Sequence, residues 1–253
     1  MKIAKYQSCQ NTFLISLYEK NINYSEMAIK LCDEKMYDVD GLLVFKNDPI
    51  EVLIYNKDGS EANMCGNGLN CITHYCYDKF RIYNYLKVLT KAGIYECELI
   101  NITPFYSSVN LGTSNISNSV KKETIKINDE SIEVYLLDIG VLHAVVFVDD
   151  FHKVKNSLDE ILSSPLIMNK YNIDFVHIDN ENSIEVITYE KGVGWTNSCG
   201  TGSAASAYVA HKFFNKNKCM NVLTPGGKTR VEINENIKLI SESSYVEDYE
   251  VNI

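Results

Sequence analysis

Short apolar runs separated by turns predict many short strands with few helices. Residues 41–45 and 51–55 are apolar-rich runs of strand length, and residues 183–187 alternate between polar and apolar side chains. Both patterns are typical of β-strands. A helix is predicted to begin at Ser25, a residue type suited to an N-cap, with Glu26 in its first turn. The pattern therefore indicates an α+β fold rich in strands.

One local pattern occurs twice, once in each half of the chain. A strand and a turn lead to Met-Cys-Gly-Asn-Gly at residues 64–68, and another strand leads to Ser-Cys-Gly-Thr-Gly at residues 198–202. Each glycine-rich segment precedes a stretch with the apolar spacing or alanine content of a helix. The duplication predicts two similar lobes, each presenting one cysteine, Cys65 or Cys199, at a helix N-terminus.

A polar stretch separates the two halves. Residues 113–119 contain few large apolar side chains, which is the composition of a linker. We therefore expect an N-terminal lobe over residues 1–117 that carries Cys65. A C-terminal lobe over residues 118–244 would carry Cys199.

Composition and charge narrow the class of protein. The net charge is −9, which argues against a nucleic-acid partner because phosphates require a basic surface. The chain has no run of about 18 apolar residues and no apolar leader. A cytoplasmic protein without a membrane partner is therefore predicted. The oligomeric state stays open, a homodimer included.

The chain has 8 cysteines and 5 histidines. In a reducing cytosol the cysteines are expected to be thiols. No Cys-x-x-Cys pair and no matched pair of histidines is present, so no metal site is predicted.

The two repeated cysteines are placed where acid/base chemistry is favourable. The first turn of a helix carries unpaired N–H groups and partial positive charge. These features hold a carboxylate and lower the pKa of a cysteine at the helix start. One thiolate would remove the α-proton of an amino acid while a thiol opposite supplies a proton to the other face, the resting pair sharing one proton. Such a site needs no pyridoxal cofactor if it excludes water.

Three other interpretations compete with this one. Each cysteine could be an inert buried thiol, since a single Cys-Gly-x-Gly is a weak signal. A phosphate-binding loop would need a Gly-Lys-Ser/Thr ending, which both segments lack. A hydrolase with one Cys/His pair gives no reason for the repeat. The duplication therefore favours an isomerase.

Several segments resemble those of the diaminopimelate epimerase family. Asp-Gly-Ser-Glu at 58–61, followed by 64–68, resembles the first catalytic segment of the family. Tyr-Glu-Lys-Gly-Val-Gly at 189–194, followed by 199–202, resembles the second. Further matches lie, in the family's order, at residues 5–6, 11–13, 172–176 and 225–227. The resemblance spans nearly the whole chain.

This resemblance implies an α+β fold with two pseudo-symmetric lobes, each a β-barrel-like sheet around a central helix. The site would lie in the cleft between the lobes, and the last strand, about residues 245–253, would return to the first lobe. It also implies an isomerase that inverts the α-carbon of a small amino acid, with no cofactor and no metal. The family's own common reaction converts LL- to meso-diaminopimelate.

The resemblance also assigns roles to individual residues. Cys65 and Cys199 would be the catalytic pair, and His143 and Glu190 would tune their pKa values. Substrate contacts are implied for Asn11, Asn56, Gly66, Asn67, Asn172, Lys191, Gly200 and Thr201. The simpler alternative for His143 is a histidine whose ring nitrogens are hydrogen-bonded within a sheet. The simpler alternative for the asparagines is a place in a turn or a helix cap.

Three departures from the family's pattern concern the distal end of the substrate. Val141 stands where the family has an asparagine, Lys191 replaces an arginine, and Trp195 replaces a glutamate. Lysine lacks the two-pronged grip of arginine on a carboxylate, and an indole near the site could fill the space of a second head group. A missing buried hydrogen-bond partner costs about 1–3 kcal/mol. We therefore predict an amino acid other than diaminopimelate, with diaminopimelate as the alternative.

Histidine is one candidate, because residues 195–200 resemble the histidine racemases of the family. Two related groups fit less well: proline racemases usually have histidine where Asn67 stands, and phenazine-biosynthesis isomerases lack the cysteine pair. A remote alternative is an inactive relative that only binds an amino acid. Both motifs retain their cysteine and glycines, which argues against it.

Overall fold

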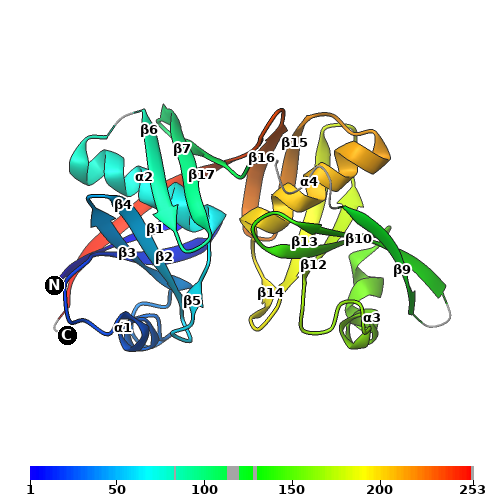
Figure 1. Cartoon of the computed structure of the whole chain (residues 1–253), viewed down its shortest axis with the longest axis horizontal. Coiled ribbons are helices and arrows are strands. Elements are labelled where there is room, and N and C mark those ends of the chain that lie inside the picture. Colours follow the sequence, from blue (N-terminus) through cyan, green and yellow to red (C-terminus); the bar gives the residue numbers. More distant parts are fainter. Residues whose placement is uncertain (83, 113–119, 128–129, 252–253) are drawn as a thin grey trace. The chain divides into compact units, whose positions relative to one another are not determined.

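The computed structural model describes residues 1–82, 84–112, 120–127 and 130–251. The chain divides into two compact units (Figure 1), the first made of Met1–Asn110 and Ile240–Ile253 and the second of Leu111–Leu239. The expected linker, residues 113–119, lies outside the described residues. The last strand begins in the second unit and continues into the first.

The first unit is a closed barrel of eight strands. Following the pairing, the order is β1, β2, β3, β4, β6, β7, β8 and β17, and β17 then pairs with β1. The β2–β3 and β4–β6 pairs are parallel, so each needs a crossover, which α1 and α2 provide. The bounds are β1 (Lys2–Ser8), β2 (Asn11–Leu17), α1 (Tyr24–Leu31), β3 (Gly41–Asn47), β4 (Ile50–Asn56), β5 (Glu61–Ala62), α2 (Gly66–Phe80), β6 (Tyr85–Thr90), β7 (Gly93–Ile102), β8 (Phe105–Asn110) and β17 (Ile237–Glu250).

The second unit repeats this order of elements. The β10–β11 hairpin leads through α3 to the parallel strand β12, and β13 leads through β14 and α4 to the parallel strand β15, which pairs with β16. Strand β9 pairs with β10. The bounds are β9 (Lys121–Ile127), β10 (Glu130–Asp138), β11 (Leu142–Phe147), α3 (Phe151–Ser163), β12 (Asn172–Ile178), β13 (Ser183–Glu190), β14 (Gly194–Thr196), α4 (Gly200–Phe214), β15 (Cys219–Thr224) and β16 (Gly227–Ile233).

The central helices α2 and α4 are each buried against strands of their own unit (Figure 1). Helix α2 packs on β1, β2, β3, β7 and β8, and α4 packs on β11, β12, β13, β15 and β16. The alanine-rich sequence of α4 is buried from Gly200 through Ala210. A helix surrounded by strands must be small and apolar on all sides, rather than amphipathic. The predicted α+β architecture, with two similar units around central helices, is thereby confirmed.

The predicted strands are confirmed, but one predicted helix start is wrong. Residues 41–45, 51–55 and 183–187 lie within β3, β4 and β13. The N-cap of α1 is Asn23, whose side chain accepts a hydrogen bond from the Glu26 N–H. The Ser25 hydroxyl instead donates to the carbonyl of Gly59 at 2.7 Å. Of the helices in the described ranges, none is long and apolar enough to cross a membrane.

Candidate functional site

Cys65 is the N-cap residue of α2. Its sulfur accepts a hydrogen bond from the Gly68 N–H at 3.4 Å, and its backbone is extended, with φ −145° and ψ 115°. The side chain of Asn67, in the first turn, donates to Asn11 Oδ1 at 2.6 Å. The first unit therefore brings Cys65, Gly66, Asn67 and Asn11 together at the start of its central helix.

Cys199 has the same place in α4. Its sulfur accepts a hydrogen bond from the Gly202 N–H at 3.4 Å, and its backbone is again extended, with φ −117° and ψ 111°. The Thr201 hydroxyl lies 3.4 Å from this sulfur. Both helices thus present a cysteine sulfur to the unpaired amides of their first turn, as the two motifs predict.

Behind Cys199 lies a chain of buried polar groups. Thr201 Oγ1 is 2.9 Å from His143 Nε2, and His143 Nδ1 is 2.6 Å from Asp174 Oδ2. The other carboxylate oxygen, Asp174 Oδ1, accepts a hydrogen bond from the Thr188 hydroxyl at 2.8 Å. His143 and Asp174 are both 0% exposed. Both ring nitrogens of His143 thus have a hydrogen-bonding partner within the unit, and one of these partners, Thr201, also connects His143 to Cys199.

Glu190, the last residue of β13, lies near this chain. Its carboxylate accepts a hydrogen bond from the Thr196 hydroxyl at 2.8 Å. Burial raises the pKa of Glu190, Asp174 adds to this, and Thr196 and His143 act in the opposite direction. The predicted pair His143 and Glu190 therefore belongs to one electrostatic environment with Cys199.

The pKa of Cys199 differs from the expectation for a cysteine at a helix start. Burial raises the pKa of this thiol well above its ordinary value, and the charges of Glu190 and Asp174 raise it further. The Thr201 hydroxyl and the Gly202 amide lower it, but by less. The pKa of Cys199 is thus raised rather than lowered, because desolvation outweighs the field of the helix terminus.

The remaining predicted contacts are held in loops at strand ends. Asn172 Oδ1 accepts a hydrogen bond from the Lys191 N–H at 3.0 Å, whereas the Lys191 side chain is exposed. Asn56 donates to the Ser60 hydroxyl at 2.9 Å in the connection between β4 and β5. Asn172 therefore fixes the backbone of the loop that carries Lys191.

Strand register shows that the two units are equivalent in structure but different in chemistry. Adjacent strands align Phe13, Gly41 and Asn56 in the first unit; in the second they align His143 with Asn172, and Glu190 lies one residue beyond the aligned pair of Ile173 and Tyr189. Asn56 precedes Cys65 by nine residues, and Glu190 precedes Cys199 by nine. The first unit thus carries Phe13 and Asn56 at the strand positions where the second unit carries His143 and Glu190.

Trp195 packs against two aromatic side chains of its own unit. Its ring contacts Tyr189 and Phe175, with centroids 5.4 and 5.9 Å apart. Both partners belong to the core cluster that packs under α3. Successive strand residues point to opposite faces, so Thr196 faces Glu190 while Trp195 faces the α3 side.

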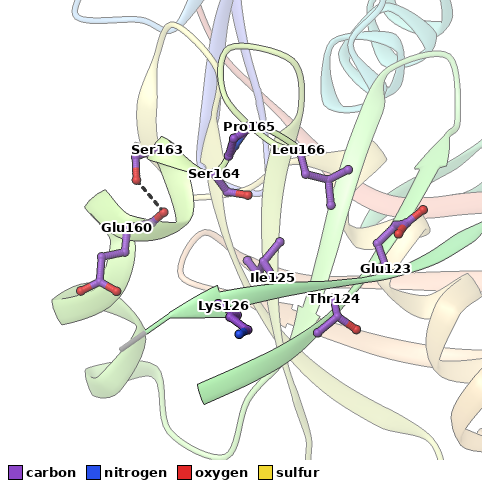
Figure 2. A pocket seen from close by; sticks show the side chains of 9 residues that line it. All are labelled: Glu123, Thr124, Ile125, Lys126, Glu160, Ser163, Ser164, Pro165 and Leu166. Atoms are coloured by element: carbon purple, nitrogen blue, oxygen red, sulfur yellow. Dashed lines mark hydrogen bonds between the residues drawn. The ribbon is translucent and has the colours of Figure 1, made fainter. Parts of the chain in front are cut away.

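A separate hollow of about 620 Å³ lies between β9 and the end of α3 (Figure 2). Its lining includes Glu123 and Lys126 from β9, with Glu160 and Ser164 from the end of α3. None of the predicted site residues lines it. Elsewhere in the described ranges, no three His, Cys, Asp or Glu side chains are grouped as a metal ion would require.

Sequence reasoning missed Asp174 and Thr188 as members of the site. The signal was present: Asp174 is a charged residue within the apolar run Ile-Asp-Phe-Val of a buried strand. A buried carboxylate needs partners, and aligning the two repeats would have placed it below the second cysteine.

Comparison with known proteins connects this arrangement to a family. The sequence matches the diaminopimelate epimerase family over residues 4–116 and 135–245. It is 32% identical to a diaminopimelate epimerase of Caldanaerobacter subterraneus, over 93% of each chain. It is 30% identical to one of Clostridium perfringens, over 98% of each chain. The solved structure of a probable proline racemase from Agrobacterium radiobacter has a similar fold, with a TM-score of 0.74 and 11% identity, covering 100% of this chain and 93% of that one.

The curated relatives are epimerases, and the solved structures of similar fold include a probable proline racemase and a hydroxyproline epimerase, so the chain is an isomerase of the epimerase and racemase class. The chain belongs to the diaminopimelate epimerase family.

Proposed function

We propose that this enzyme inverts the α-carbon of an amino acid, using Cys65 and Cys199 as its two acid/base groups and no cofactor. The observation that carries the proposal is that the same cysteine and helix arrangement occurs once in each unit. Each cysteine is the N-cap of the central helix of its unit, and each sulfur accepts a hydrogen bond from the third residue of that helix. A single reactive cysteine would not require a second copy.

The raised pKa of Cys199 supports placing the shared proton of the pair on this residue. Burial and the nearby carboxylates favour the neutral thiol at Cys199, so we take Cys199 as the proton donor and Cys65 as the base for one enantiomer. Cys65 then removes the α-proton of one enantiomer, while Cys199 donates its proton to the opposite face of the carbon. The reverse reaction exchanges these roles, as microscopic reversibility requires.

The first turns of both helices would hold the α-carboxylate of the substrate. Gly66 and Gly200 open their helices without a side chain, which allows close approach to backbone amides. Asn67 and Thr201 add polar side chains at the following positions. These donors would stabilise the negative charge that develops on the carboxylate as the proton leaves.

For the substrate, we propose an amino acid other than diaminopimelate and place histidine first for testing. Val141 carries the argument, since its side chain has no hydrogen-bonding group for a distal carboxylate. Lys191 adds to it by offering only a point charge. Trp195 no longer contributes, given its contacts with Phe175 and Tyr189.

The second candidate substrate is diaminopimelate. It is favoured by the relatives at 30–32% identity, which are named as diaminopimelate epimerases. Asn56 and Asn172, two of the positions implied to contact the substrate, are also retained, and Lys191 keeps the positive charge of the arginine that it replaces.

The test is exchange of the α-proton in deuterated water, followed by NMR under reducing conditions. The panel contains L-amino acids, with histidine and LL-diaminopimelate among them, and the Cys199→Ser enzyme is the control. Exchange with histidine or another single amino acid supports the altered substrate, and efficient exchange with diaminopimelate contradicts it. No exchange with any member would contradict the proposed reaction.

A further inference from the structure

Asp174 is a fully buried carboxylate whose two oxygens have different partners. The Thr188 hydroxyl donates to Oδ1 at 2.8 Å, and His143 Nδ1 lies 2.6 Å from Oδ2. A buried charge is costly unless it is paired and hydrogen-bonded. The ionised carboxylate therefore requires a proton on His143 Nδ1, because only an N–H can donate to it.

The geometry on the other side of the imidazole leads to Cys199. With Nδ1 directed to Asp174, Nε2 faces the Thr201 hydroxyl at 2.9 Å. That hydroxyl lies 3.4 Å from the Cys199 sulfur. A hydroxyl both donates and accepts, so Thr201 can bridge the thiol and the ring nitrogen in either direction.

The first unit shows that the fold does not need an acid at this position. Strand register aligns Asp174, between Val145 and Thr188, with Leu43, between Ile15 and Ile54. Leu43 is also fully buried. The same barrel position is therefore apolar under one cysteine and anionic under the other.

The helix above is fitted to the carboxylate. A Cβ on Gly202 would lie well inside van der Waals contact with Asp174 Oδ1 and 3.0 Å from Thr188 Oγ1. On Gly68, the equivalent glycine, a Cβ would meet Leu43 Cδ2 at 3.3 Å. The carboxylate thus lies directly below the first turn of α4, where partial positive charge favours an anion.

We propose that Asp174 is a positioning residue for Cys199: it fixes His143 with its proton on Nδ1, so that Thr201 passes a proton between the Cys199 sulfur and His143 Nε2. The inference deepens the proposed function and rests on it for its role in turnover. For the enantiomer whose α-proton Cys199 removes, the S–H proton first moves to Thr201 Oγ1 while the Thr201 hydroxyl proton moves to Nε2. The result is a thiolate and an imidazolium, whose positive charge is balanced by Asp174.

The first test reads the state of His143 without any substrate. Nitrogen-15 NMR of histidine-labelled enzyme distinguishes Nδ1–H from Nε2–H, with His143→Gln identifying the signal. The wild type is expected to carry Nδ1–H, and Asp174→Asn should convert neutral His143 to Nε2–H. A neutral Nε2–H ring in the wild type, or an unchanged tautomer in the variant, would overturn the proposal.

The second test asks whether Asp174 acts through His143, using the rate of α-proton exchange. Asp174→Asn is expected to slow exchange at least tenfold in the wild type but to have no further effect in the His143→Gln enzyme, the non-additivity expected of a coupled pair. Thr201→Val should slow exchange while leaving the His143 tautomer unchanged. This variant still tests the relay if Asp174→Asn does not fold. Additive losses, or full exchange in Thr201→Val, would overturn the relay.

The NMR measurement of the His143 tautomer and the exchange assay test different claims: the first tests the role of Asp174, and the second tests the proposed function. An Nδ1–H signal in an enzyme that exchanges no amino acid would refute the proposed function and leave the Asp174 assignment standing. Normal exchange with an Nε2–H ring would refute the assignment and leave the function standing.

Discussion

Gly202→Ala should damage the second unit, whereas Gly68→Ala should leave the first unit nearly intact. The two glycines have the same place in equivalent helices, three residues after a cysteine. The added methyl group meets Asp174, which is fully buried and held by His143 and Thr188. At Gly68 its tightest contact is a terminal methyl of Leu43, at 3.3 Å, and Cys65 Cβ and Sγ lie at 3.4 and 3.5 Å, which is ordinary contact.

The magnitudes follow from this difference. Overpacking costs about 1–3 kcal/mol, and disturbing hydrogen bonds to a buried charge adds about 1.5–3 kcal/mol. The helix preference of alanine over glycine returns about 1 kcal/mol. Gly202→Ala should therefore lower the free energy of unfolding by about 2–5 kcal/mol. For Gly68→Ala the helix preference offsets a mild contact, and the change should stay within about 1 kcal/mol.

Urea unfolding followed by tryptophan fluorescence measures this directly, because the chain has 1 tryptophan and it lies in the second unit. With a slope of about 2–3 kcal/mol per M, the midpoint of Gly202→Ala should fall by about 0.7–2.5 M. Far-UV circular dichroism follows both units in the Gly68→Ala control. Equal midpoints for Gly202→Ala and the wild type would refute the close fit between α4 and Asp174.

Three further predictions concern the chemistry of the cysteines. Cys65→Ser and Cys199→Ser should each lower racemisation by about 10²–10⁴-fold, measured by circular dichroism of the substrate, and normal racemisation by both would contradict the two-base mechanism. Because the Glu190 charge raises the pKa of Cys199, Glu190→Gln should lower that pKa. The variant then has more thiolate at each pH from about 7 to 9. Alkylation of Cys199, followed by mass spectrometry of its peptide, should therefore be faster than in the wild type. Unchanged or slower alkylation would show that Glu190 does not act on this thiol. If the two thiols serve one carbon, mild oxidation should inactivate the enzyme and a reductant should restore it, whereas full activity after oxidation of both would exclude thiol catalysis.

The pattern of apolar residues predicts strands at residues 41–45, 51–55 and 183–187 and a helix after each of the two cysteines, and all of these are present in the structure. Strand positions such as 41–45 follow from local spacing, and the glycine after each cysteine marks a helix start that depends on neighbouring residues alone. The start of α1 was mispredicted because two suitable caps, Asn23 and Ser25, lie close together. Tertiary contact with Gly59 decides between them.

The electrostatics of the site could not be predicted from the motif. A cysteine at a helix start is expected to have a lowered pKa, but burial together with Glu190 and Asp174 raises that of Cys199. This outcome depends on the packing of strands far apart in the sequence. The direction of Trp195 likewise depends on the register of β14 with β13.

The measurement that tests the central claim most directly is the early time course of isotope incorporation in deuterated water. A single L-amino acid substrate is converted to a small extent, and the two enantiomers are then separated and analysed by mass spectrometry. With Cys65 and Cys199 acting as two different acid/base groups, the D-product should carry deuterium from the first turnover while the recovered L-substrate keeps its proton. Equal deuterium in substrate and product from the earliest times, or transfer of the original proton to the product, would contradict the two-cysteine account.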